Sequence, residues 1–123
     1  MEVSSLIHQS DSLNSFPLSM NEVEIRLLTK KDDDILKVEL VYNEKYKFAK
    51  GVHYLEMKKV MDDGVHDFYV VRLKVKDKRL AYVFLITLLD GKKYYFSESG
   101  IHNSYDIAHA QFDFFSSIIY QQS

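Results

Sequence analysis

Aromatic side chains are the residues of this chain best suited to bind a ligand. The sequence contains nine Tyr and eight Phe but no Trp, more aromatic residues than a core of this size alone must use. Tyr42, Tyr46, Phe48 and Tyr54 follow one another around the end of one expected strand and its loop. Sugars present apolar C–H faces that stack on such rings, and a phenol can also hydrogen-bond a hydroxyl. The alternative, that these rings serve a core or a protein interface, stays open.

The carboxylates, histidines and serines of the chain form no pattern typical of a catalytic or metal site. A glycosidase needs two carboxylates in one cleft, and no pair of acids here has a spacing that would place both in one pocket. The acidic run at 32–34 lacks the alternating ligands, central Gly and terminal Glu of an EF-hand, so we expect a hairpin turn there and another turn at 62–64. No HExxH motif and no G-x-S-x-G elbow occurs. We expect no catalytic residue, metal site or cofactor, and we place the histidines at strand ends and in loops: His8, His53, His66, His102 and His109.

Composition limits the function classes further. A chain of 123 residues with 46% hydrophobic residues fits one domain with its own core. A net charge of −2, from 16 basic and 18 acidic residues, creates no field that would hold nucleic acid. The absence of cysteine excludes disulfides and thiolate metal sites. Because we find neither a signal peptide nor an apolar stretch near the roughly 20 residues of a membrane span, we expect a soluble, cytoplasmic protein with no nucleic-acid or membrane partner.

Hydrophobic alternation predicts the strands that would position the aromatic residues. Apolar and polar residues alternate with a period of two in several segments, which is typical of half-buried strands. The segment at 79–89 is instead apolar at nearly every position, as in a strand with both faces covered. Strands are expected at 3–8, 22–29, 36–42, 53–60, 68–76, 79–89, 92–99 and 111–115.

Polar and turn-forming residues separate these strands. Residues 9–20 contain Pro17, the only proline, and are expected to form a connection. Asp90 and Gly91 predict a hairpin with a type I′ turn, which requires positive φ at both positions. About seven or eight strands with regularly spaced turns predict an all-β fold, an immunoglobulin-like antiparallel β-sandwich.

Three blocks of the sequence, in order and with similar spacing, resemble one family. They are LIH with FPL (6–8 and 16–18), IRLLTKKDDDILKVELVYNEKY (25–46) and HDFYVVRLKVKDKRLAYVFLITLLDGKKYYFSESG (66–100), followed by FDFF (112–115). These blocks are similar to the N-terminal β-sandwich domain of neopullulanases, cyclomaltodextrinases and maltogenic amylases. The chain departs from the family pattern at Tyr69 and Val70, where an aromatic Trp or Phe is usual.

The resemblance implies a non-catalytic domain that precedes a (β/α)₈ barrel cleaving α-1,4 and in some members α-1,6 glucosidic bonds. In such enzymes the domain commonly mediates a domain-exchanged homodimer, packs on the partner's barrel and narrows its active-site cleft. The tyrosine that matches Tyr46 lies on the loop that reaches the partner's substrate, and some members carry sugar sites here, as starch-binding modules do. Tyr46 would then stack on malto-oligosaccharides or cyclodextrins, with Tyr42 or Phe48 supporting the loop.

Two hypotheses therefore remain. In the first, residues 1–110 are the β-sandwich accessory domain of an α-glucan-hydrolysing enzyme, and residues 111–123 lead toward its catalytic barrel. In the second, the chain is an immunoglobulin-like structural or protein-interaction domain that binds no sugar. Neither hypothesis gives the chain an enzymatic activity of its own.

Overall fold

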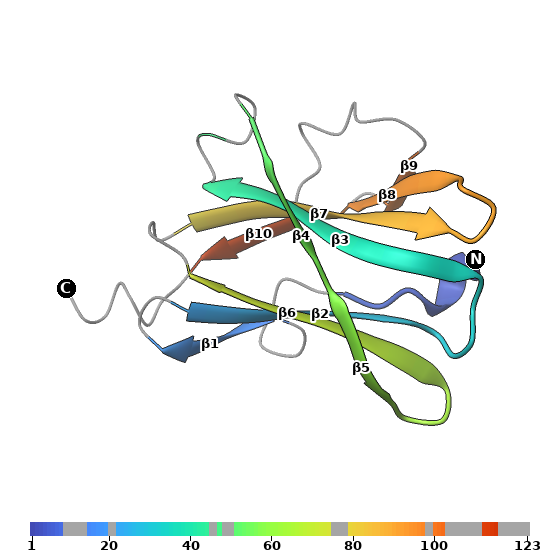
Figure 1. The fold of residues 1–123 in the computed structure, drawn as a ribbon. Coiled ribbons are helices and arrows are strands. Elements are labelled where there is room, and N and C mark those ends of the chain that lie inside the picture. The colour runs from blue at the N-terminus through green and yellow to red at the C-terminus, as the bar shows by residue number, and fades with distance from the viewer. Residues whose placement is uncertain are drawn as a thin grey trace.

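Two antiparallel β-sheets packed face to face make up the described part of the chain (Figure 1), which confirms the predicted all-β sandwich. The computed structural model describes residues 1–8, 15–19, 22–44, 47, 51–74, 79–97, 100–102 and 112–115. These residues form one 3₁₀ helix and ten strands, more strands than predicted. The elements are η1 (Val3–Ser5), β1 (Ser15–Ser19), β2 (Glu22–Lys30), β3 (Ile35–Glu44), β4 (His53–Glu56), β5 (Lys58–Asp62), β6 (His66–Lys74), β7 (Arg79–Leu88), β8 (Lys93–Ser97), β9 (Gly100–His102) and β10 (Phe112–Phe115).

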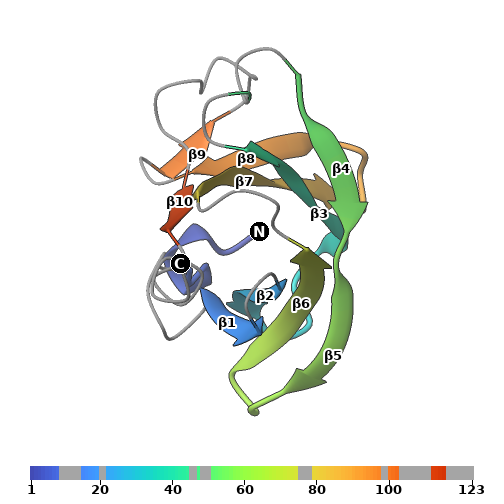
Figure 2. The same ribbon diagram turned by 90° about the vertical axis from the view of Figure 1, so that its left-hand side faces the viewer.

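The strands are divided into a four-stranded and a six-stranded sheet. The first has the order β1-β2-β6-β5, and the second has the order β4-β3-β7-β8-β9 with β10 also paired to β7. β10 pairs with the first residues of β7, whereas β8 pairs with a later part of the same strand. The strand expected at 111–115 is thereby confirmed. Figure 2 shows the two layers from the end, with η1 between them on one side.

The core lies between the inner faces of β2, β3 and β7. Ile25 of β2, Leu40 of β3 and Phe84 of β7 are fully buried there. Burial of one such side chain stabilises the fold by about 1.5–3 kcal/mol. The outer side of β7 is also covered, because Val83 is fully buried as well. The prediction that residues 79–89 form a strand with both faces covered is confirmed.

The single strand expected at 53–60 is wrong, because two strands of different sheets occupy this segment. β4 pairs with β3 and β5 pairs with β6. Met57 separates them: its N–H donates a hydrogen bond to the carbonyl of Val38 at 2.8 Å, and its side chain is only 3% exposed. The chain thus runs along one side of the sandwich as a continuous ribbon from one sheet to the other (Figures 1 and 2). Alternation alone carries no sign of such a change of sheet.

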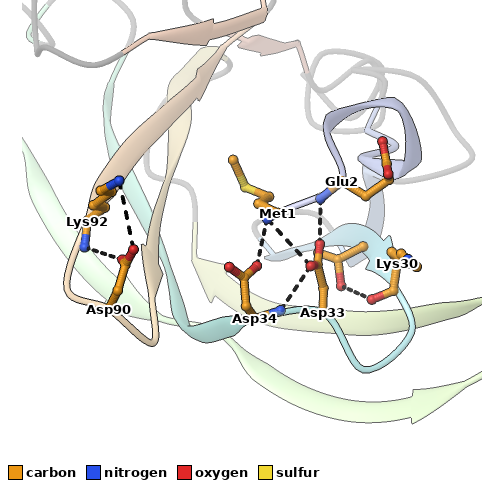
Figure 3. A network of polar contacts seen from close by, with 8 residues as sticks. Met1, Glu2, Lys30, Asp33, Asp34, Asp90 and Lys92 are labelled. Atoms are coloured by element: carbon orange, nitrogen blue, oxygen red, sulfur yellow. Dashed lines mark hydrogen bonds and ion pairs between the residues drawn. The ribbon is translucent and has the colours of Figure 1, made fainter.

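The N-terminal segment also differs from the prediction. Residues 3–8 form η1 followed by a single bridge between Ile7 and Leu28, not a strand. The first residues of the chain are bound to the turn at 31–34 (Figure 3). The α-amino group of Met1 lies 2.7 Å from Oδ1 of Asp34, and the N–H of Glu2 donates to Oδ2 of Asp33 at 2.7 Å.

Three connections need correction. The turn at 31–34 joins β2 to β3, which belong to different sheets, so it is not the expected hairpin. Residues 9–20 are not only a connection, because β1 lies within them as an edge strand; Pro17 is tolerated at an edge, next to a register shift. The hairpin at 88–92 is confirmed but its type I′ turn is wrong: Gly91 has φ 91°, while Asp32 is the only described non-glycine residue with positive φ.

The observed hairpin uses a three-residue loop. The N–H of Gly91 donates to the carbonyl of Leu88 at 3.0 Å, and the N–H of Leu88 donates to the carbonyl of Lys92 at 2.8 Å. This is a turn followed by a glycine bulge, which needs positive φ at one position only. Within the described segments, no helix has the length and hydrophobicity needed to cross a membrane.

Candidate functional site

A groove of about 420 Å³ opens at the end of β3, where β4, β6 and β7 also contribute. It contains Tyr42, one of the three predicted site residues. Tyr42 of β3 pairs with His53 of β4 on one side and with Tyr82 of β7 on the other. The groove is lined by Tyr42, Asn43, Glu44, Lys47, His53, Lys74 and Leu80.

Tyr42 is only partly available to a ligand. Its side chain is half-buried and packs against the main core, while part of it lines the groove. The rings of Tyr42 and His53 have their centroids 5.5 Å apart and are tilted by 45°. The pair therefore offers a fixed aromatic wall rather than a freely exposed stacking platform.

Asn43 fastens the loop that begins at this groove. Its amide Nδ2 donates to the carbonyl of Gly51 at 2.8 Å and to that of Lys47 at 3.3 Å, and its Oδ1 accepts from the N–H of Glu44 at 2.8 Å. Each such bond contributes about 0.5–1.5 kcal/mol net. The ammonium of Lys47 also lies 2.8 Å from the carboxylate of Glu44. The side chain of Asn43 thus ties Lys47 and Gly51 to the end of β3.

The other two predicted site residues, Tyr46 and Phe48, belong to this segment but lie outside the described residues. Their predicted roles stay predictions. The described residues that bracket them, Glu44, Lys47 and Gly51, are hydrogen-bonded to Asn43, the residue that follows Tyr42. The groove also combines cationic, acidic and amide side chains with aromatic surface.

Tyr54, the fourth clustered aromatic residue, does not join this site. It pairs with Val41 and stands on the outer face of the six-stranded sheet, 52% exposed. Tyr95 lies on the same outer face. Burial raises the pKa of the Tyr95 phenol, and the nearby Tyr54 and Glu39 raise it further. Proximity in the sequence therefore groups Tyr42 with Tyr54, but the alternation of side chains along strands separates them.

No pattern in the sequence connects Tyr42 with its partners in the groove. His53 reaches the groove from β4, the strand that follows β3 in the chain, and Lys74 reaches it from the end of β6. His8 was expected in a loop or at a strand end, yet it is 7% exposed. Its Nδ1 lies 2.7 Å from the carbonyl oxygen of Arg26, and its Nε2 lies 2.7 Å from the hydroxyl of Tyr82, the neighbour of Tyr42 across the sheet. The apolar neighbours of His8 in LIH were the available signal for its burial.

Several aspartates of the described chain stabilise turns. No group of three or more His, Asp or Glu side chains is placed to hold a metal ion in the parts that the structure describes. Asp33 and Asp34 face the α-amino group of Met1 (Figure 3), and the hydrogen bond to Asp34 is the main cause that raises the pKa of this amine. Asp90 accepts a hydrogen bond from the N–H of Lys92 within its own turn at 3.0 Å.

Comparison with known sequences identifies relatives along almost the whole chain. The model of the family described as "Alpha amylase, N-terminal ig-like domain" matches residues 1–120. Neopullulanase 2 from Thermoactinomyces vulgaris is 29% identical over 102 residues, which cover 81% of this chain and 17% of that protein. A cyclomaltodextrinase from Geobacillus thermopakistaniensis is 26% identical over 106 residues, which cover 84% of this chain and 18% of that protein. The chain thus spans less than a fifth of either relative.

Solved structures agree in fold. A cyclomaltodextrinase structure superimposes with a TM-score of 0.83 at 21% identity, covering 94% of this chain and 20% of the other. The type III pullulan hydrolase from Thermococcus kodakarensis gives a TM-score of 0.51 at 21% identity, covering 76% of this chain and 15% of the other. These superpositions and the match over residues 1–120 confirm the immunoglobulin-like sandwich. The chain belongs to the family of alpha amylase N-terminal ig-like domains.

Proposed function

We propose that this chain is a non-catalytic accessory domain that binds α-glucans for an enzyme of the neopullulanase or cyclomaltodextrinase type. The observation that carries the proposal is the groove at Tyr42, next to the segment whose ends Asn43 holds in place. A preformed groove of this kind reduces the entropy lost when a flexible glucan binds. The parent enzyme would hydrolyse α-1,4 glucosidic bonds and, as in some members, α-1,6 bonds.

In this proposal the sugar ring stacks on Tyr46, and Tyr42 and Phe48 support the loop. The hydroxyl groups of the sugar can meet the polar side chains of the groove, among them His53 and Lys74. Stacking on one aromatic ring with a few hydrogen bonds supports only weak binding, because part of the cleft would come from a catalytic domain. We therefore expect affinity for malto-oligosaccharides and cyclodextrins in the millimolar range for this chain alone.

The proposal includes an architectural role. Residues 1–110, together with β10 (Phe112–Phe115), which pairs with β7, would form the accessory domain, and the remainder of residues 111–123 would lead toward a (β/α)₈ catalytic domain. The domain would pack on that barrel and on the barrel of a partner subunit, so that a homodimer forms and the partner's active-site cleft narrows. The short span of this chain relative to its relatives, 17% and 18% of their lengths, is compatible with an additional catalytic domain in such a parent.

A second candidate is an immunoglobulin-like protein-interaction domain without sugar binding. Exposed apolar side chains favour it, since Val60 and Met61 of β5 are 55% and 56% exposed and Leu89 is 67% exposed. Such residues on a monomer often mark a contact surface when they lie together. The two candidates differ in which residues, if any, should change their chemical shifts when sugar is added.

Chemical-shift mapping separates them. The ¹⁵N-labelled chain is titrated with maltoheptaose and, in parallel, with β-cyclodextrin. The glucan-binding proposal expects amide shifts at Tyr42, Asn43, His53 and Lys74, while Val60 and Met61 stay unchanged. An absence of shifts at millimolar sugar would leave the interaction domain as the better account.

A further inference from the structure

The four-stranded sheet has an open edge halfway along β6. β5 pairs with β6 only at Asp67–Val70. The residues before Met57 belong to β4, which pairs with β3 in the other sheet, so they do not extend this pairing. The opposite edge of β6 pairs with β2 along its whole length. In the described part of the chain, no strand pairs with the β5 side of β6 over residues 71–74. These four residues span about 13 Å, and the N–H and C=O groups of alternate residues among them point away from β2, toward this edge.

A groove of about 590 Å³ lies along this open edge, and we call it the β6 notch. It is lined by parts of β2, β4, β5 and β6. Its apolar surface comes from Leu55 of β4, from Val70 and Val71 of β6, and from Val60 and Met61, which are more than half exposed.

Cationic side chains predominate among the accessible charges of the β6 notch. Glu24 is only 4% exposed, and its carboxylate is bound by Nε of Arg26 at 2.7 Å and by Nε of Arg72 at 3.0 Å. The side chain of Arg72 remains 67% exposed, so its other donors face solvent. Lys58 is exposed on the neighbouring strand. Among the described residues of the notch, only the carboxylate of Glu56 opposes these exposed cations.

We propose that the β6 notch binds an extended, acidic segment of a partner protein, which adds to β6 as an antiparallel strand. Strand addition of this kind takes its affinity from main-chain hydrogen bonds and its specificity from alternate side chains. One side of the incoming strand would place apolar residues against Leu55 and Val71. The other side would place a carboxylate near Arg72 and Lys58. This site is separate from the groove at Tyr42 and does not depend on sugar binding.

The test uses a capped peptide of about seven residues with alternating valine and glutamate, long enough to cover the open edge. A second peptide with lysine in place of glutamate is the control. We expect the glutamate peptide to shift the amides of Val71 to Lys74 in an NMR titration and to give α-proton contacts with β6. We expect the lysine peptide to bind at least fivefold more weakly.

A charge reversal at an exposed position provides the matched variant. Lys58→Glu should lower the affinity for the glutamate peptide by about two- to fivefold, which corresponds to the energy of an exposed ion pair. Lys93→Glu, an exposed residue of β8 in the other sheet, should leave the affinity unchanged. Because both lysines are exposed, neither variant is expected to unfold.

Four outcomes would overturn the proposal. Equal binding of the two peptides would remove the preference for an acidic segment. Shifts without contacts to β6 would exclude strand addition. Displacement of the peptide by maltoheptaose would assign the notch to sugar. Shifts of the same amides when the chain alone is concentrated would make a second copy of the chain the occupant.

Discussion

The imidazole of His8 and the hydroxyl of Tyr82 lie 2.7 Å apart in the interior, although 74 residues separate them in the sequence. The other nitrogen of His8 faces the carbonyl of Arg26 at 2.7 Å. Because a carbonyl oxygen can only accept, Nδ1 carries the hydrogen, and in the neutral ring Nε2 accepts from the phenol. One side chain of the N-terminal segment thus joins β2 of one sheet to β7 of the other, directly beside Tyr42.

Removal of the Tyr82 hydroxyl should destabilise the fold. Tyr82→Phe leaves Nε2 of the buried His8 without this donor, which should lower the free energy of unfolding by about 1–3 kcal/mol. Urea denaturation measures the difference. Tyr94→Phe on the neighbouring strand is the control, since Tyr94 is only half-buried, and it should change stability by less than about 0.5 kcal/mol. Equal effects of the two substitutions would contradict a special role for the His8–Tyr82 bond.

Replacement of Thr87 by valine should stabilise the fold. Its hydroxyl is buried, and among the described residues it has no hydrogen-bond partner. Thr87→Val removes an unsatisfied polar group at nearly constant volume, so we expect a gain of about 1 kcal/mol. Thermal unfolding measures it. Thr29→Val is the matched comparison, because the Thr29 hydroxyl donates to the carbonyl of Lys30 at 3.4 Å; this substitution should not stabilise. A loss of stability in Thr87→Val would refute the account of this residue.

Substitution of Asn43 should lower the affinity for sugar and reduce the free energy of unfolding only slightly. Asn43→Ala removes three partly exposed hydrogen bonds, so we expect a loss of about 1 kcal/mol in unfolding free energy together with weaker maltoheptaose binding. Asn43→Asp keeps the acceptor for the N–H of Glu44 but loses both donated bonds. NMR titration of the two variants should show the same loss of affinity. Wild-type affinity in Asn43→Asp would show that the donated bonds do not hold the site.

The turn between β5 and β6 should weaken in acid through Asp63. Hydrogen bonds from the N–H groups of His66 and Val65, at 2.6 and 2.9 Å, lower the pKa of the Asp63 carboxyl. Since the folded-state pKa is below the unfolded value of about 3.9, the stabilising effect is complete above that value. It is lost as the pH falls through the folded-state pKa.

The measurement is the unfolding free energy of wild type and Asp63→Asn from neutral to acid pH. Asparagine keeps an oxygen that can accept both bonds but does not titrate. The stability difference between the two proteins should therefore change below about pH 4. Parallel curves down to the lowest pH at which the protein folds would disprove the role of this carboxylate.

Local alternation was sufficient for the strands whose two faces differ. β2, with Val23, Ile25 and Leu27 buried, and β6, with Tyr69 and Val71 buried, both show a period of two. It was insufficient where one segment serves two sheets. Met57 continues the pattern of its neighbours, and the change of sheet is seen only in the pairing of β4 with β3 and of β5 with β6.

The candidate site could be predicted only in part, because the sequence orders residues along the chain and the site collects them across strands. Tyr42 was found and lines a groove, but Tyr54 points to the opposite face of the same sheet. His53 and Lys74 have no local pattern that would connect them to Tyr42. Tyr46 and Phe48 remain predictions that rest on the family resemblance and on the loop ends held by Asn43.

The most direct test of the proposed glucan site compares the affinity of wild type and Tyr46→Ala for maltoheptaose. The affinity is measured from the amide chemical-shift changes of Asn43 and His53 during an NMR titration. If Tyr46 provides the stacking surface, its removal should weaken binding by about tenfold, because an aromatic contact contributes on the order of 1 kcal/mol or more. Unchanged shifts at Asn43 and His53 and an unchanged affinity in Tyr46→Ala would contradict the proposal.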